Sequence, residues 1–139
     1  MAKEVLAASF RFFRPVNLAT MRSDSFPDPH AFAQDWIAAW NSHDLERILS
    51  HYAADVVFTS PAAARIVGSG VVRGKPALRA YWAKALAAVP DLNFELEDIF
   101  KGHAALTILY RGVGGRRVAE TMAFGADGLV TQAYAAYAK

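Results

Sequence analysis

The chain has 139 residues, of which 54% are hydrophobic and 12% aromatic, and its formal net charge is +2. This length is typical of one domain, and the apolar content argues against intrinsic disorder. The small net charge gives no support to nucleic-acid binding, and the absence of cysteine excludes disulfides and thiol nucleophiles. No apolar run approaches the roughly 18 residues that a membrane-spanning helix needs.

The first residues differ in character from the rest of the chain. Their apolar side chains at helical spacing are Val5, Leu6, Phe10 and Phe13. Three interpretations stay open: an extra helix or arm packed on the domain, a native start at Met21, and a targeting segment, since the stretch is basic and poor in acids. We divide the chain into an extension and linker, residues 1–27, and one domain, residues 28–139. A cytoplasmic location is expected unless residues 1–26 act as a targeting signal.

The domain is predicted to open with two helices and a strand. Asp28 is a good N-cap and Pro29 suits the first helical position. Aromatic residues then recur every fourth position and mark one helix face, at Phe32, Trp36 and Trp40. Polar residues 41–44 interrupt this pattern, and a shorter helix is predicted from Leu45, Ile48, Leu49 and Tyr52. The β-branched and aromatic residues 56–59 predict a strand that Pro61 ends.

A loop, a third helix and a meander of strands are predicted next. Residues 62–70 are expected to form a loop, with a short strand as an alternative at 65–67. The helix is predicted from apolar residues at helical spacing, Leu78, Tyr81, Trp82, Ala85, Leu86 and Val89. From Leu92 the period becomes two, which predicts strands at about residues 92–100, 104–111, 117–124 and 129–138, joined by hairpin-length turns. The chain is therefore expected to be an α+β domain with three helices on one face of a curved, mainly antiparallel sheet.

Several of these segments resemble the nuclear transport factor 2-like superfamily. They are the aromatic first helix, the break Asn41-Ser42-His43-Asp44, the segment HYAADVVF, the strand closed by Pro61, and the later RGKPALRAYWAKALAAVPDLNFEL and ADGLVTQAY. The resemblance covers roughly residues 29–137 and is closest to SnoaL-like and ketosteroid-isomerase-like proteins. It implies a cystatin-like roll with a cone-shaped pocket, and a homodimer formed through the sheet face. Because this fold hosts enzymes, ligand binders and interaction modules, the resemblance leaves the function open.

Glu120 is the main candidate for chemistry. It shares one strand face with the large side chains Val118, Met122 and Phe124. If large residues line the cone, Glu120 points into it, and burial would raise its pKa and suit it to acid/base catalysis. The alternatives are a solvent-facing Glu120 or an ion pair with Arg116 or Arg117. By resemblance, Glu120 takes the place of a carboxylic acid that helps ketosteroid isomerases to hold the oxyanion of the substrate.

Two other positions depart from the ketosteroid-isomerase pattern. By resemblance, Ser60 stands in place of the general-base Asp, and Trp36 in place of an oxyanion-binding Tyr. Because a Ser hydroxyl is a poor base without a partner, the known steroid isomerisation is not expected. Ser60 is instead predicted to orient a ligand or water, or to bond nearby backbone as strand-end serines do. His51 is a third candidate, either at the cavity rim or against residues 62–70.

Neither a metal nor a cofactor is expected. The four histidines lack metal-site spacing, and the glycine-rich stretch 112–115 joins two strands and does not open a helix. The side chains expected to line the cone and contact a ligand are Trp36, Trp40, Tyr52, Phe58, Trp82, Phe94, Tyr110, Met122, Phe124 and Tyr137.

Three functions remain open at this point. The first is a domain that binds a small hydrophobic molecule and carries out a cofactor-independent isomerisation, cyclisation, dehydration or hydrolysis. The second is a binder without catalysis. The third is a dimeric interaction module whose cone is filled by Trp36, Trp82 and Phe94.

Overall fold

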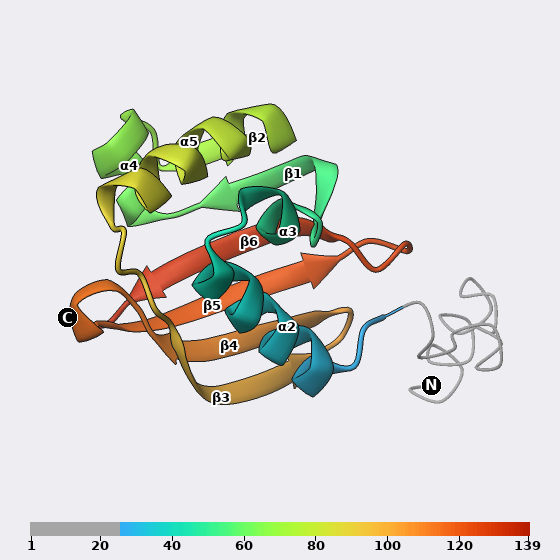
Figure 1. Cartoon of the computed structure of the whole chain (residues 1–139). Coiled ribbons are helices and arrows are strands. Elements are labelled where there is room, and N and C mark those ends of the chain that lie inside the picture. The colour runs from blue at the N-terminus through green and yellow to red at the C-terminus, as the bar shows by residue number, and fades with distance from the viewer. Residues whose placement is uncertain (1–25) are drawn as a thin grey trace, which may run out of the picture.

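Helices cover one side of a curved sheet, as Figure 1 shows. The computed structural model describes residues 26–139, and the expectations for the N-terminal extension lie outside the described residues. The helices are α2 (Pro29–Ser42), α3 (Leu45–Leu49), α4 (Pro61–Val67) and α5 (Lys75–Ala88), with a 3₁₀ turn η2 (Val113–Gly115). The strands are β1 (Tyr52–Thr59), β2 (Val71–Arg73), β3 (Glu95–Gly102), β4 (Ala105–Arg111), β5 (Arg117–Phe124) and β6 (Val130–Tyr137). Within this range, no helix is long and apolar enough to cross a membrane.

Helix α2 begins and ends where its capping residues predict. The Asp28 carboxylate accepts a hydrogen bond from the Ala31 N–H at 2.9 Å, and Pro29 occupies the first turn. The helix ends at His43, which adopts a left-handed conformation with φ 61°. Its buried face consists of Phe32, Ala33, Trp36, Ala39 and Trp40. Two caps that are encoded locally therefore fix the position of five core residues, three of them aromatic, against the sheet.

The prediction for the segment after α3 is wrong in one respect. The short helix ends at Leu49, and Tyr52 is the first residue of β1 rather than the last turn of a helix. Buried Tyr52 accepts a hydrogen bond from the Trp36 indole N–H at 2.8 Å, and the His51 carbonyl accepts one from the Val130 N–H at 2.9 Å. These long-range bonds extend the strand toward its N-terminus, and the helical periodicity of the sequence does not predict them.

The predicted loop after Pro61 contains a fourth helix. Ser60 caps α4 through a hydrogen bond from the Ala62 N–H at 3.1 Å, Pro61 begins the helix, and Gly68 ends it with φ 80°. The alternative of a short strand at residues 65–67 is therefore wrong. The local signals are the same as those that start α2, but this helix buries only Ala63 and carries no apolar stripe.

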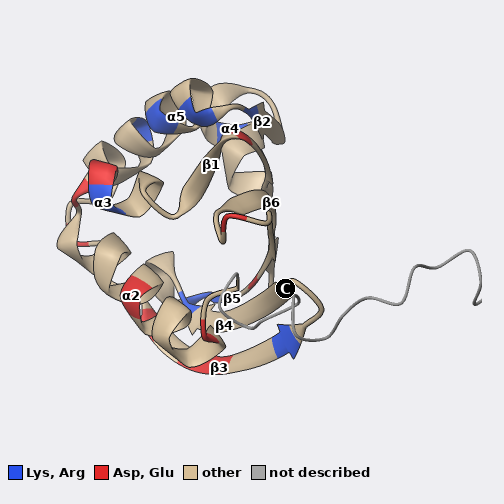
Figure 2. Cartoon of the chain, turned by 90° about the vertical axis from the view of Figure 1, so that its right-hand side faces the viewer, with Lys and Arg blue, Asp and Glu red and all other residues tan. Residues whose placement is uncertain are grey.

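The six strands form one sheet in the order β2-β1-β6-β5-β4-β3. The pairs are antiparallel except β1 with β6, which run parallel. The view in Figure 2 shows that the sheet curls and that α2, α3 and α5 close the open side. The chain therefore forms an α+β roll with four helices on a curved, mostly antiparallel sheet.

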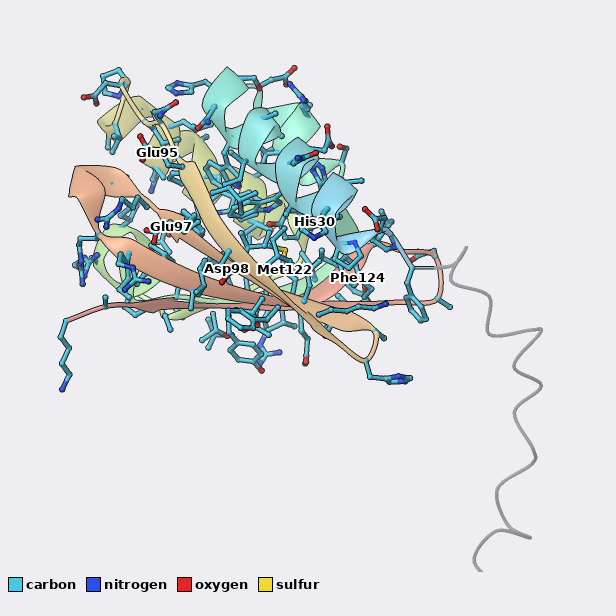
Figure 3. All side chains as sticks on the ribbon, turned by 90° about the horizontal axis from the view of Figure 1, so that it is seen from below. His30, Glu95, Glu97, Asp98, Met122 and Phe124 are labelled. Atoms are coloured by element: carbon cyan, nitrogen blue, oxygen red, sulfur yellow. The ribbon has the colours of Figure 1, made fainter. Side chains whose placement is uncertain are left out.

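The inner face of the sheet meets the helices and forms the core. On β5, buried Val118, Glu120, Met122 and Phe124 alternate with more exposed residues. Met122 and Phe124 lie between the sheet and α2 in Figure 3, and the Phe124 ring contacts the Phe32 ring at a centroid distance of 5.0 Å. The strand period thus turns Glu120 to the same side as these apolar residues.

Candidate functional site

A cavity of about 240 Å³ lies between the helices and the inner face of the sheet. Its walls come from α2, β1, α4, α5, β4, β5 and β6, and most of the lining side chains are aromatic or aliphatic. The lining residues that are also exposed to solvent are Arg65, Ile66, Val113 and Arg116. We call these four residues the mouth, since they mark where the cavity opens between α4 and η2.

Glu120 is the single carboxylate among the described residues that line this cavity. The side chain is 3% exposed, and it accepts a hydrogen bond from the Tyr110 hydroxyl at 3.2 Å. Burial raises the pKa of Glu120 to about 8, while the bond from Tyr110 acts in the opposite direction. With that pKa, about nine-tenths of the protein carries a neutral Glu120 at neutral pH.

Glu120 neither faces solvent nor forms an ion pair with Arg116 or Arg117. Arg117 forms an ion pair with Glu97 at 3.4 Å on the outer side of the sheet. Arg116 lies over the Tyr137 ring at 5.1 Å and donates to the Ala138 carbonyl at 3.3 Å. Both cations are therefore engaged elsewhere, and Glu120 stays in the interior without a cationic partner.

Three tyrosines line the cavity together with Glu120, namely Tyr81, Tyr110 and Tyr137. Burial raises the pKa of Tyr110 well above its usual range and raises the pKa of Tyr81 to about 12. The pKa of Tyr137 also rises because of burial, and hydrogen bonding to the Ser60 side chain opposes this rise in Tyr81 and Tyr137. Glu120 contributes to the pKa rise of all three tyrosines through its charge, so these hydroxyls and the carboxyl group form one polar cluster in an apolar wall.

Two buried indoles differ in their hydrogen bonding. The Trp36 N–H donates to the Tyr52 hydroxyl at 2.8 Å, whereas the Trp40 N–H has no partner among the described residues. Trp40 is 6% exposed and lines the cavity. An unpaired buried donor costs about 1–3 kcal/mol, and this nitrogen has almost no accessible surface through which a molecule in the cavity could reach it.

The structure brings only part of the predicted set to the cavity. The predicted residues that line it are Trp40, Phe58, Trp82, Phe94, Tyr110, Glu120 and Tyr137. Trp36, Tyr52, Met122 and Phe124 are buried in the surrounding core instead. Ser60 is 1% exposed and lies behind the lining, where it caps α4 and contacts two lining tyrosines.

His51 lies away from the cavity. Its Nε2 is 2.7 Å from the Asp35 carboxylate, and its Nδ1 is 3.0 Å from the Ile48 carbonyl. The ring also packs edge-on against Phe32. Because the strand starts at Tyr52, His51 sits at the α3–β1 junction and turns toward α2, away from residues 62–70. Across residues 26–139, no group of histidines and carboxylates could hold a metal ion.

Three lining residues with polar side chains, Tyr81, Arg65 and Arg116, are absent from the predicted site. The sequence pattern places Tyr81 only in the apolar stripe of its helix, although a tyrosine in such a stripe brings a hydroxyl that needs a partner when buried. The apolar pattern places Arg65 in a loop, whereas the capping signals at Ser60 and Gly68 indicate a helix. The glycine-rich stretch 112–115 predicts a turn before Arg116, but it does not predict that this turn brings Arg116 to the mouth.

Comparisons with known proteins agree with this architecture. The sequence profile described as SnoaL-like domain matches residues 33–133. A SnoaL-like protein of unknown function from Burkholderia thailandensis is 43% identical, with 80% of this chain and 94% of that chain covered and a TM-score of 0.78. Among curated proteins, no sequence matches significantly.

More distant solved structures share the fold. A candidate isomerase of the SnoaL-like family from Agrobacterium tumefaciens is 17% identical, with coverage of 80% and 97% and a TM-score of 0.64. TerC, co-crystallised with polyporic acid, is 15% identical, with coverage of 80% and 92% and a TM-score of 0.65. The profile match and the 43% identical relative carry the assignment: the chain belongs to the family of SnoaL-like domains.

Proposed function

We propose that this domain binds a small, mostly apolar organic molecule and uses Glu120 as a general acid or base in a cofactor-independent reaction. The observation that carries the proposal is a buried, neutral carboxyl group without a cationic partner in a cavity of about 240 Å³. An empty apolar cavity of about 150 Å³ accepts benzene in another protein, so this volume suits a bicyclic molecule. TerC, a protein of the same fold, was co-crystallised with polyporic acid.

Glu120 would act on an oxygen of the ligand. A protonated carboxyl group can donate a hydrogen bond or a proton to a carbonyl oxygen, and a pKa near the working pH is efficient for this step. The Tyr110 hydroxyl would hold Glu120 in place. Proton transfer next to a carbonyl, as in an isomerisation, is the reaction class that this donor arrangement fits best.

A test uses 2-tetralone, a bicyclic ketone with exchangeable protons beside its carbonyl. The wild-type protein is expected to accelerate deuterium incorporation at that carbon in D₂O, followed by NMR. Glu120→Gln should lose most of this acceleration, by about 100-fold or more. Glu95→Gln is the matched control, because Glu95 is exposed on β3 and outside the cavity lining.

The second candidate is a binder without catalysis. It is favoured by the absence of a second acid among the described residues that line the cavity. Ser60, which by resemblance stands in place of the base, caps α4 instead. Binding of 2-tetralone without faster exchange would support this candidate. Absence of both binding and exchange would contradict both, and would favour the interaction module.

We also propose a homodimer formed through the outer face of the sheet. This face carries small residues and two exposed aromatic side chains, Phe100 at 55% and Tyr134 at 51% exposed. The Thr107 and Thr121 hydroxyls, 2.8 Å apart, satisfy each other and leave this part of the face flat. Val130, at the start of β6, does not belong to this surface, because it is buried in the core.

Light scattering after size-exclusion chromatography tests the dimer. The wild-type protein should show twice the chain mass, and Tyr134→Glu should shift it toward the monomer because a charge would be buried at the interface. Ala87→Glu, at an exposed position of α5, is the control and should leave the mass unchanged. A monomeric wild-type protein at high concentration would contradict the dimer.

A further inference from the structure

The cationic residues of the cavity are concentrated at its mouth. The cavity lining contains two arginines, Arg65 and Arg116, and both belong to the four exposed residues of the mouth. The other two mouth residues, Ile66 and Val113, are apolar, with 40% and 50% of their surface exposed. The mouth therefore combines positive charge with an apolar rim.

Neither arginine is neutralised by a carboxylate among residues 26–139. Arg47, Arg79, Arg111 and Arg117 each form an ion pair with Asp or Glu, whereas Arg65 and Arg116 form none. The one carboxyl group in the lining, Glu120, is buried and mostly neutral. The cavity and its mouth thus carry about two uncompensated positive charges at neutral pH.

Both guanidinium groups affect the pKa of tyrosines in the cavity lining. The positive charge of Arg65 lowers the pKa of Tyr81 and Tyr137, in opposition to burial, and Arg116 has the same effect on Tyr137. Arg116 is also held in place by the Tyr137 ring and by its bond to the Ala138 carbonyl. These contacts fix one cation against the cavity wall and bring the second toward the same tyrosines.

We propose that the ligand is a small organic acid, whose apolar body fills the cavity and whose carboxylate lies at the mouth between Arg65 and Arg116. This proposal rests on the function proposed above, and names the class of ligand for the same cavity. A planar guanidinium group can bind a carboxylate through two parallel hydrogen bonds, and Arg is the side chain best suited to such recognition. Arg116 directly precedes β5 and lies four positions before Glu120, which corresponds to about 13 Å of extended backbone. An acid of bicyclic size can therefore contact the mouth and approach Glu120 at the same time.

A matched pair of probes separates charge from shape. 2-Naphthoate and 2-naphthamide have the same bicyclic body and nearly the same planar end group, but only the first is an anion. Isothermal titration calorimetry with the whole chain near neutral pH and at low ionic strength is expected to give at least about tenfold tighter binding of 2-naphthoate. Added salt should weaken the binding of 2-naphthoate and leave that of 2-naphthamide unchanged.

Arginine variants test which side chains bind the carboxylate of 2-naphthoate. Arg65→Gln and Arg116→Gln should each weaken 2-naphthoate binding by about fivefold, a size typical of exposed ion pairs, without changing 2-naphthamide binding. Arg65→Lys should retain part of the affinity, because the charge remains. Arg73→Gln removes a charge from an exposed position outside the lining and should change nothing. Thermal unfolding followed by circular dichroism checks that each variant is folded.

The outcomes distinguish this proposal from the function on which it rests. Equal binding of acid and amide would overturn the acidic ligand and leave a cavity that binds neutral molecules. The acidic ligand would also be overturned if 2-naphthoate bound the double variant Arg65→Gln/Arg116→Gln as tightly as it binds the control Arg73→Gln. Binding of neither probe would overturn both the acidic ligand and the binding function of the cavity.

Discussion

Replacement of Glu120 by glutamine should change how the stability of the protein depends on pH. The pKa of Glu120 rises from 4.5 to about 8 on folding because the side chain is buried, so the folded state holds this proton more tightly than the unfolded state. The stability that the proton contributes is fully present below the unfolded pKa and is lost as the pH rises through the folded pKa. For a group with these two pKa values, the loss between about pH 5 and about pH 9 is about 4 kcal/mol. Glutamine does not titrate, and its variant should lack this loss.

Urea unfolding, followed by tryptophan fluorescence, measures the effect. The free energy of unfolding of the wild-type protein minus that of Glu120→Gln should fall by about 4 kcal/mol between about pH 5 and about pH 9. The subtraction removes the contributions of other titrating groups, which both proteins share. A difference that stays constant within about 1 kcal/mol would refute the reasoning, because it would mean that Glu120 is already ionised or solvated in the folded protein.

Two further predictions concern stability. Trp36→Phe should lower the free energy of unfolding in urea by about 1 kcal/mol more than Trp40→Phe does. Only the first change removes a hydrogen bond of the indole, to the Tyr52 hydroxyl, because the Trp40 N–H has no partner among the described residues. Equal losses would mean that the Trp40 N–H has an acceptor. Asn41→Ala should lower the free energy of unfolding by about 2 kcal/mol, because the Asn41 side chain donates to the Phe94 carbonyl at 2.9 Å and accepts from the Phe94 N–H at 2.6 Å. Asn93→Ala, at an exposed position next to Phe94, is the control. A similar loss in that variant would contradict the role assigned to Asn41.

The parts of the fold that the sequence predicts are those with local causes. Asp28 and Pro29 locate the start of α2, and the strand period turns Glu120 inward. Helix α4 has an equally good cap at Ser60, but its surface position leaves no apolar stripe, so periodicity favours a loop. The start of β1 depends on the bond between Trp36 and Tyr52, which lie 16 residues apart, and no local pattern contains it.

The candidate site depends more strongly on long-range geometry. A register shift between Leu96 and Asp98 makes Glu97 an extra residue of β3, where it pairs with Arg111 and Arg117. Arg117 is thus ion-paired on the face of β5 opposite to Glu120. No cation therefore opposes the effect of burial on the pKa of Glu120. The mouth also depends on long-range geometry, because a surface helix and a glycine-rich turn bring Arg65 and Arg116 to one opening.

The position of β6 determines the order in which the sheet can be completed. β6 lies between β1 and β5 and is synthesised after all other strands of the sheet. Until it is made, β1–β2 and β3–β4–β5 are two separate pieces with no direct pairing between them, and each exposes an unpaired edge. A truncation that removes residues 130–137 would thus divide the sheet into two parts, and the nascent chain must avoid aggregation until its central strand has joined them.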